Sequence, residues 1–408
     1  MKKPELRIEA DELGEMEVPM HSLWGVRTAR WLSRSRAGAM QYQETRLHPL
    51  MVEALALTYK AKLALARSGD AGDNGADGAA LQAATTLKGQ VLDEILNGQL
   101  KDQLLVDLRL SPLGEAVFDN LNEVVEGRAR ELLGLRAHEG RQGAQIKNKP
   151  LATASGKAAA RLPLTGASYF LAAVRLAANL ALRDLESTLL DLERLVRRQS
   201  LTLEKGLRQM GRESREELAP ATVFSLFGNA AERNLKRLKE TRNKLLELSL
   251  DAPKNYQYAF ALELANLTGM PFREAEQTTS PVETEKSGDT LSRQAVMDLQ
   301  QVAAMLKELS IDISHMCQVL SGLSESFTDS TVESPDRLTS HSSTLSLACL
   351  RVQAEEMQVS LALQADINRS ACPAISLAAH GILSSSDALK SALKSFNQGY
   401  LSRLKLRN

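Results

Sequence analysis

Apolar residues recur at regular helical steps along three long stretches of the chain. In the most regular stretch they are Leu299, Val302, Leu306, Leu309, Ile313, Met316, Leu320 and Leu323. In the other two stretches the repeat comes every seventh residue, at Leu171, Ala178, Leu185 and Leu192 and at Phe224, Ala231, Leu238 and Leu245. This spacing keeps one apolar stripe of a helix against partner helices over many turns. The pattern therefore predicts a mainly α protein with a central bundle of long helices, whose stripes are often shared between subunits.

Shorter helices and polar breaks complete the pattern. Helical spacing predicts further helices over residues 49–66, 79–96, 117–133 and 385–396. Two polar stretches, residues 138–166 and residues 324–344, predict long loops, and helical spacing resumes at Leu345. The Ser- and Thr-rich loop at 324–344 follows a long core helix, and loops on rigid scaffolds often carry function. We therefore expect this loop to decide what the protein does.

Composition and charge exclude several function classes. The 408 residues balance 50 Lys and Arg against 50 Asp and Glu, so no overall field favours nucleic acid or an anionic membrane as partner. The basic run at 234–244 has leucines at helical spacing, which favours a solvated helix face. The six His and three Cys show no paired zinc-ligand spacing, and we expect neither metal nor cofactor. No apolar run reaches membrane-spanning length, and we expect a cytoplasmic protein.

Three segments of the chain carry a family resemblance. They are Arg7–Thr28, Asn122–Gly134 and Glu263–Gly269, in this order and at suitable spacing. In them the chain resembles the fumarase/aspartase superfamily, most of all its aspartase and class II fumarase branch. The resemblance implies a three-domain helical subunit whose five long central helices assemble into a homotetramer. For this chain it implies an N-terminal helical domain at 1–137, the central bundle at 138–370 and a remnant of a largely absent C-terminal domain at 371–408.

The family's reaction removes ammonia or water from a dicarboxylate, such as aspartate or malate, to give fumarate. Negative charge builds up on a carboxylate in the transition state, and donors aimed at that charge usually make the largest catalytic contribution. Four family motifs supply the groups that act on the substrate. The first, Gly-Thr-Ser-Thr-Asn-Met-Asn, aligns with residues 114–120, where Glu115, Ala116 and Val117 replace its three hydroxyl residues.

The other three motifs are altered as well. The second, Ser-Ser-Asn-Asp, aligns with Thr165–Ser168 and has lost its amide and its acid. The third, Gly-Arg-Thr-His, reads Gly211–Ser214, and serine cannot relay a proton near neutral pH as imidazole does. The fourth is a mobile loop with a catalytic serine and a lysine, and it aligns with residues 329–340. There Ser330 takes the serine position and Arg337 the lysine position.

Position by position, the resemblance implies a small polar site. Its catalytic residues are Ser330 and Ser214, and its substrate-binding residues are Arg212, Arg337, Asn122, Thr331 and His138. A loop histidine that faces water is the simpler interpretation of His138. His341, between Ser340 and Ser342, suggests a Ser–His dyad, but adjacent residues in a flexible loop seldom align in that way.

Three functions stay open at this point. We favour a non-catalytic, oligomeric binding or regulatory subunit, because all four motifs have lost polar groups together. The second is an active lyase with an altered substrate, which performs β-elimination from a carboxylate by breaking a C–N or C–O bond. The third is a degenerate subunit that assembles with an active paralogue. We expect a homotetramer or such a hetero-oligomer, a small carboxylate as ligand, and neither nucleic acid nor membrane as partner.

Overall fold

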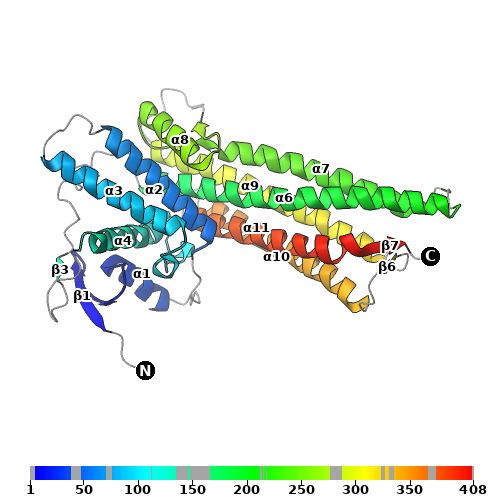
Figure 1. Ribbon diagram of the computed structural model, residues 1–408, viewed down its shortest axis with the longest axis horizontal. Coiled ribbons are helices and arrows are strands. Elements are labelled where there is room, and N and C mark those ends of the chain that lie inside the picture. The colour runs from blue at the N-terminus through cyan, green and yellow to red at the C-terminus, as the bar shows by residue number, and fades with distance from the viewer. Residues whose placement is uncertain are drawn as a thin grey trace. The chain divides into compact units, whose positions relative to one another are not determined.

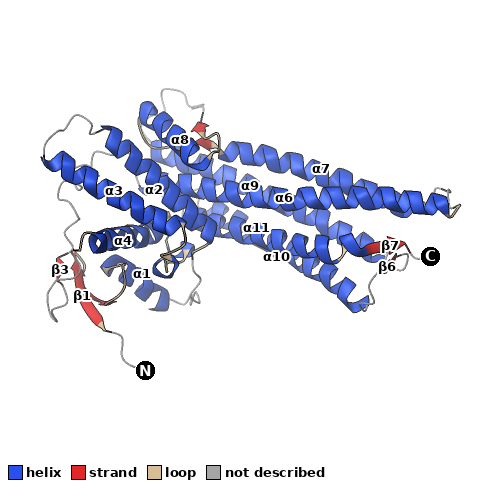
Figure 2. Cartoon of the chain, viewed as in Figure 1, coloured by secondary structure: helices blue, strands red, loops and turns tan. Residues whose placement is uncertain are grey.

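Helices dominate the structure, a computed structural model (Figures 1 and 2). It describes residues 5–37, 47–69, 76–111, 113–134, 146–147, 166–211, 214, 216, 218–275, 287–322, 327–329, 335–365 and 374–406. The chain divides into two units. The first comprises Met1–Ala177, Leu246–Ala295 and Arg369–Leu377, and the second comprises Ala178–Leu245, Val296–Asn368 and Ala378–Asn408. The mainly α fold class predicted from the sequence is confirmed.

A β-hairpin begins the first unit, where the sequence shows no long periodicity. Strand β1 (Leu6–Asp11) pairs antiparallel with β2 (Gly14–Pro19), with Leu6 opposite Pro19 and Asp11 opposite Gly14. The short β3 (Ile146–Lys147) joins β1 in parallel, so that the order is β2-β1-β3. Gly14 has a φ of 112°, a conformation that glycine adopts without strain.

Helices cover the rest of the first unit. They are α1 (Val26–Ala37), α2 (Pro49–Gly69), α3 (Ala76–Leu96), α4 (Glu115–Leu132) and α8 (Lys254–Thr268), with short 3₁₀ turns at η1 (Lys101–Gln103) and η2 (Leu108–Leu110). Helix α2 packs on α3 and α8, and α4 packs on α1 and α3. The strands β4 (Glu247–Leu248) and β5 (Arg273–Glu274) pair in parallel beside α8. The predicted helices at 49–66, 79–96 and 117–133 are thereby confirmed.

Five long helices supply most of the second unit. They are α6 (Gly166–Gln209), α7 (Ala219–Leu245), α9 (Ser287–Gly322), α10 (Pro335–Ala365) and α11 (Ala374–Gly399), and of these α6, α9 and α11 begin in the first unit. They are followed by η5 (Leu401–Arg403), and a small antiparallel ladder joins β6 (Phe327–Asp329) to β7 (Leu404–Leu406). The described residues of the apolar stripes that predicted α6, α7 and α9 are buried, as Leu185, Leu238 and Leu309 show, and Leu323 lies outside the described residues. Burying one such side chain stabilises the fold by about 1.5–3 kcal/mol.

Polar contacts join these helices in a closed order. Asn179 of α6 donates to the carbonyl of Arg242 in α7 (2.9 Å), and Asn234 of α7 donates to Asp312 of α9 (2.8 Å). Lys307 of α9 donates to Glu356 of α10 (2.7 Å), and Arg351 of α10 donates to Ser384 of α11 (2.7 Å). Asn397 of α11 donates to the carbonyl of Thr188 in α6 (3.3 Å). The order is therefore α6–α7–α9–α10–α11 and back to α6. Of residues 371–408, expected as a remnant of another domain, those from 378 onward belong to this unit. The three-domain division itself stays a prediction.

The sequence-based prediction of one loop over 324–344 is wrong at its carboxyl-terminal end. Helix α10 begins at Pro335, ten residues before the predicted start at Leu345. Proline suits the first position of a helix. The loop had been predicted because residues 335–344 include many Ser and Thr. Along α10 the Thr344 hydroxyl instead donates to the carbonyl of Ser340 one turn earlier. In the described part of the chain, no helix has an 18-residue stretch apolar enough to span a membrane.

Candidate functional site

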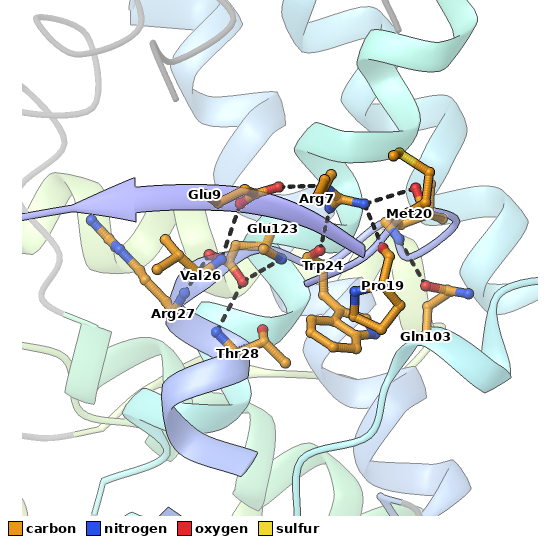
Figure 3. Close-up of polar contacts among 12 residues, drawn as sticks. Arg7, Glu9, Pro19, Met20, Trp24, Val26, Arg27, Thr28, Gln103 and Glu123 are labelled. Atoms are coloured by element: carbon orange, nitrogen blue, oxygen red, sulfur yellow. Dashed lines mark hydrogen bonds and ion pairs between the residues drawn. The ribbon is translucent and has the colours of Figure 1, made fainter. Parts of the chain in front are cut away.

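Arg7 lies at the centre of a polar network between the hairpin and the start of α1 (Figure 3). Its guanidinium donates to the Glu9 carboxylate at 2.8 Å and to the carbonyl oxygens of Pro19, Met20 and Trp24 at 2.7, 2.9 and 2.8 Å. The Arg7 and Glu9 side chains are both almost fully buried. A planar, permanently charged group with four acceptors fixes the path of the chain around it. Arg7 is therefore a positioning residue of the scaffold.

Carboxylates fill the amino-terminal end of α1. Glu123 of α4 accepts hydrogen bonds from the backbone N–H groups of Gly25, Arg27 and Thr28, at 2.8, 2.9 and 3.0 Å (Figure 3). Glu9 accepts a further one from the N–H of Val26 at 3.1 Å. The first N–H groups of a helix have no partner within the helix and attract anions. Here the protein's own side chains occupy that anion site.

A glycine is required just before α4, where the first family motif aligns. Gly114 has a φ of 76°, which disfavours any residue with a Cβ. An added Cβ would also overlap the ring of Phe170 at the start of α6. The rings of Phe118 and Phe170 meet edge to face, with centroids 6.5 Å apart. The loop before α4 is thus packed directly against aromatic side chains.

The start of α4 is capped by its own loop. The Ser111 hydroxyl accepts from the backbone N–H of Ala116 at 3.0 Å. The Glu115 carboxylate accepts from the backbone N–H of Leu113 at 3.1 Å, and Ala116 and Val117 are buried. The residues that replace the family hydroxyls are therefore two buried apolar side chains and one carboxylate that bonds within the loop.

Asp119 and Asn120 complete this segment, and both make structural contacts. Trp31 of α1 donates its indole N–H to Asp119 at 3.0 Å. The buried Asn120 amide accepts from the Leu105 N–H at 3.0 Å and donates to the Gln103 carbonyl at 3.1 Å. The polar side chains of Glu115, Asp119 and Asn120 thus all form hydrogen bonds within the protein.

Comparisons with known proteins agree with this architecture. No family model matches the chain. The class II fumarate hydratase of Pseudomonas putida is 31% identical over 291 residues, which cover 65% of this chain and 55% of that protein. The aspartate ammonia-lyase of Bacillus subtilis is 25% identical over 279 residues, which cover 65% of this chain and 54% of that protein.

Solved structures extend the likeness of fold to nearly the whole chain. The native fumarate lyase:delta crystallin of Brucella melitensis has a TM-score of 0.74 at 18% identity, covering 99% of this chain and 90% of that one. A recombinant class II fumarase of Schistosoma mansoni has a TM-score of 0.73 at 16% identity, covering 99% and 85%. The chain is thus similar in sequence to class II fumarate hydratases and aspartate ammonia-lyases, and it shares its fold with these two solved structures. It spans about half the length of the curated relatives it matches.

The structure places two of the predicted site residues with their side chains. Asn122 is half-buried on α4 in the first unit, and Ser214 is exposed between α6 and α7 in the second. Arg337 lies in the first turn of α10, where only its backbone is described. His138, Arg212, Ser330 and Thr331 lie outside the described residues. The site that joins these residues stays a prediction.

A Ser–His contact exists in the structure, but it joins His341 to a serine distant in sequence and not to the neighbours that the sequence suggested. His341 Nδ1 of α10 lies 3.0 Å from the hydroxyl of Ser395 on α11, 54 residues away. His341 is half-buried and Ser395 is exposed. No local pattern could reveal this pair, because it depends on which faces of two helices meet. In the described ranges, no group of three His, Cys, Asp or Glu side chains is placed to hold a metal ion.

Sequence reasoning also missed the roles of Arg7, Glu9 and Glu123. All three lie in the segments that resemble the superfamily, and that resemblance was the available signal. Their contacts show that these segments carry the architecture of the first unit.

Proposed function

We propose that this protein keeps the scaffold of its superfamily without the elimination reaction, and acts as a non-catalytic, oligomeric binding or regulatory subunit. The observation that carries the proposal is the start of α4, where Ser111 and Glu115 satisfy backbone groups within the protein. In the family motif, three hydroxyl residues at this place would grip a substrate carboxylate. Glu115 instead places negative charge there, which opposes the binding of a dianion.

The expected loss of rate from the replaced groups supports a loss of the elimination reaction and not merely a change of its substrate. Removing one preorganised donor costs about 10²–10³ in rate. Three hydroxyl residues are replaced at 115–117, and a serine, Ser214, stands where the family has histidine. A serine hydroxyl cannot exchange protons near neutral pH as imidazole does. Together these losses leave little of the parent reaction.

An exposed apolar stripe on α10 supports the oligomeric part of the proposal. Leu347, Leu350, Met357 and Leu361 are 66%, 58%, 64% and 60% exposed, and Ala354 completes their alternating steps of three and four. A second stripe on the same helix, which includes Leu345, Val352 and Val359, is buried. A helix that is apolar on both faces needs a partner on its outer face. We infer that this partner is a helix of another subunit, either a second copy or an active paralogue.

The catalytic part is tested by following fumarate release with aspartate, malate, argininosuccinate and adenylosuccinate, with an active aspartase as positive control. We expect no turnover above the buffer blank. Sustained turnover would instead support the alternative, a lyase with an altered substrate. Ser214→Ala and Glu115→Ala separate real turnover from a contaminant, because a contaminating enzyme is unaffected by either change.

The oligomeric part is tested by light scattering of the purified protein and by co-purification from its native cell. We expect Leu350→Glu with Met357→Glu to reduce the particle mass, because the pair puts charge on the exposed stripe. Gln358→Glu adds a charge at an exposed position beside the stripe and serves as the matched control. A monomer in both experiments before any substitution would contradict the proposal.

A further inference from the structure

Lys62 of α2 places its ammonium against aromatic rings in the first unit. Its Nζ lies 4.4 Å from the ring centroid of Tyr169 in α6 and 5.9 Å from that of Tyr59 in α2. The Tyr169 hydroxyl shares a hydrogen bond of 3.3 Å with the hydroxyl of Tyr256 in α8. Lys62 as a residue is half-buried, and its amine lies against these rings.

Two lysines near Lys62 have carboxylate partners. Lys60 pairs with Asp93 at 2.5 Å, and Lys88 of α3 pairs with Glu126 of α4 at 3.2 Å. Within the part of the chain that the structure describes, Lys62 forms no ion pair. Ring faces attract a cation, but they do not replace the hydrogen bonds that a buried ammonium loses with water. Among the described residues, the Lys62 ammonium is therefore in contact with rings but not with a carboxylate.

Its surroundings favour the free amine of Lys62. Burial, with a smaller contribution from the charge of Lys88, lowers the pKa of Lys62 from 10.5 to about 8. Burial raises the pKa values of Tyr59, Tyr169 and Tyr256, so these phenols stay neutral and supply no counter-charge. A lysine that is desolvated next to another cation is the usual setting of a nucleophilic amine.

We propose that Lys62 is a reactive amine that condenses with a small carbonyl compound, an aldehyde or a ketone. The ammonium first gives one proton to water, and the lone pair of the free amine then attacks the carbonyl carbon, so that a C–N bond forms as the C=O π bond breaks. The two remaining protons of the amine pass to the oxygen, which leaves as water, and the imine takes one proton back from water. The protonated imine therefore carries the same single positive charge as the original ammonium, so the rings of Tyr59 and Tyr169 stabilise it as well. Acylation would remove that charge, which is why this site favours carbonyl compounds over acyl donors.

The test is reductive alkylation of the full chain with acetaldehyde and cyanoborohydride, which traps the protonated imine as an ethylamine. Peptide mass spectrometry measures the rate at each lysine as a function of pH. At neutral pH we expect Lys62 to react at least about tenfold faster than Lys60 and the exposed Lys101, because a larger share of it is free amine. The ratio of the Lys62 rate to the Lys60 rate should be lower with an acetylating reagent.

Variants show whether the surroundings of Lys62 cause this reactivity. Lys88→Gln removes the neighbouring charge and should shift the pH midpoint of Lys62 alkylation upward, with an unchanged circular dichroism spectrum. Tyr169→Phe keeps the ring and should preserve the rate, whereas Tyr169→Leu removes the ring and should slow it. The proposal is overturned if Lys62 reacts no faster than Lys60, or if it does not react at all. It is also overturned if Lys88→Gln leaves the midpoint in place.

Discussion

Glu123 Oε2 accepts a hydrogen bond of 2.8 Å from the backbone nitrogen of Gly25, which lies 98 residues earlier in the chain. A Cβ on residue 25 would overlap the Glu9 carboxylate and crowd that of Glu123. The two carboxylates can reach the start of α1 only because residue 25 is a glycine. This contact ties the amino-terminal hairpin segment to α4.

We expect Glu123→Ala to lower the free energy of unfolding by about 2 kcal/mol, because three backbone N–H groups lose a charged acceptor. Glu123→Gln keeps the shape but not the charge, and its loss should be smaller. Urea unfolding followed by circular dichroism measures both. Glu12→Ala, at an exposed position in the hairpin turn, is the control. A loss no larger than that of Glu12→Ala would show that water replaces the carboxylate at no cost.

Two asparagines on α4 should differ in what they contribute. Asn120 is buried and bonded through both amide atoms, so Asn120→Ala should lower the free energy of unfolding by about 2 kcal/mol. Asn122 is half-buried, and Asn122→Ala should change the free energy of unfolding by less than about 0.5 kcal/mol. Thermal and urea unfolding of the two variants decide this. If Asn122→Ala proved the more damaging change, the assignment of Asn120 to the scaffold would be wrong.

The long helices could be predicted because their apolar period is local and persists over many turns. Leu185, Leu238 and Leu309 all sit on the buried faces that the spacing indicated. The start of α10 could not be predicted, because Ser340 and Thr344 belong to a composition typical of loops. The hydrogen bond from the Thr344 hydroxyl to the Ser340 carbonyl within the helix is visible only in the structure.

The polar contacts are the part that sequence patterns could not supply. The bond between Glu123 and Gly25 and the contact between His341 and Ser395 join residues 98 and 54 positions apart. Their formation depends on how helices pack, which no local period encodes. The resemblance drew attention to the right segments at 7–28 and 122–134, but it did not reveal that their side chains serve the scaffold.

His341 and Gly399 of the second unit should show an energetic coupling. Ala normally stabilises a helix relative to Gly by up to about 1 kcal/mol. At position 399, however, an added Cβ would overlap the His341 ring. We expect Gly399→Ala to lower the free energy of unfolding by about 1–2 kcal/mol, because the ring must move and give up its contact with Ser395.

A double-mutant cycle checks this coupling by urea unfolding. In a His341→Ala background the ring is gone, so Gly399→Ala should become neutral or stabilising. A destabilisation of equal size in both backgrounds would mean that the ring is not the obstacle.

The buried thiols of α9 and α10 should make stability fall at alkaline pH. Burial raises the pKa of Cys317 from 9.0 to about 11, and burial together with the neighbouring Cys317 raises that of Cys349 to about 12. Above pH 9 the unfolded chain loses thiol protons that the folded chain keeps. The unfolded state then binds fewer protons, so the free energy of unfolding decreases as pH rises from about 9 through 11.

Urea unfolding at neutral pH and at about pH 10 measures this decrease, and Cys349→Ala isolates one thiol. The substitution removes a group of altered pKa, so it should make the decrease shallower, whatever constant offset the lost volume adds at both pH values. Iodoacetamide supplies an independent measure, because only the thiolate reacts and both thiols are buried. Alkylation of Cys317 and Cys349 should therefore be slow in the folded protein and fast in urea. Rapid alkylation of either thiol in the folded state would show that α9 and α10 separate far more readily than their packing indicates.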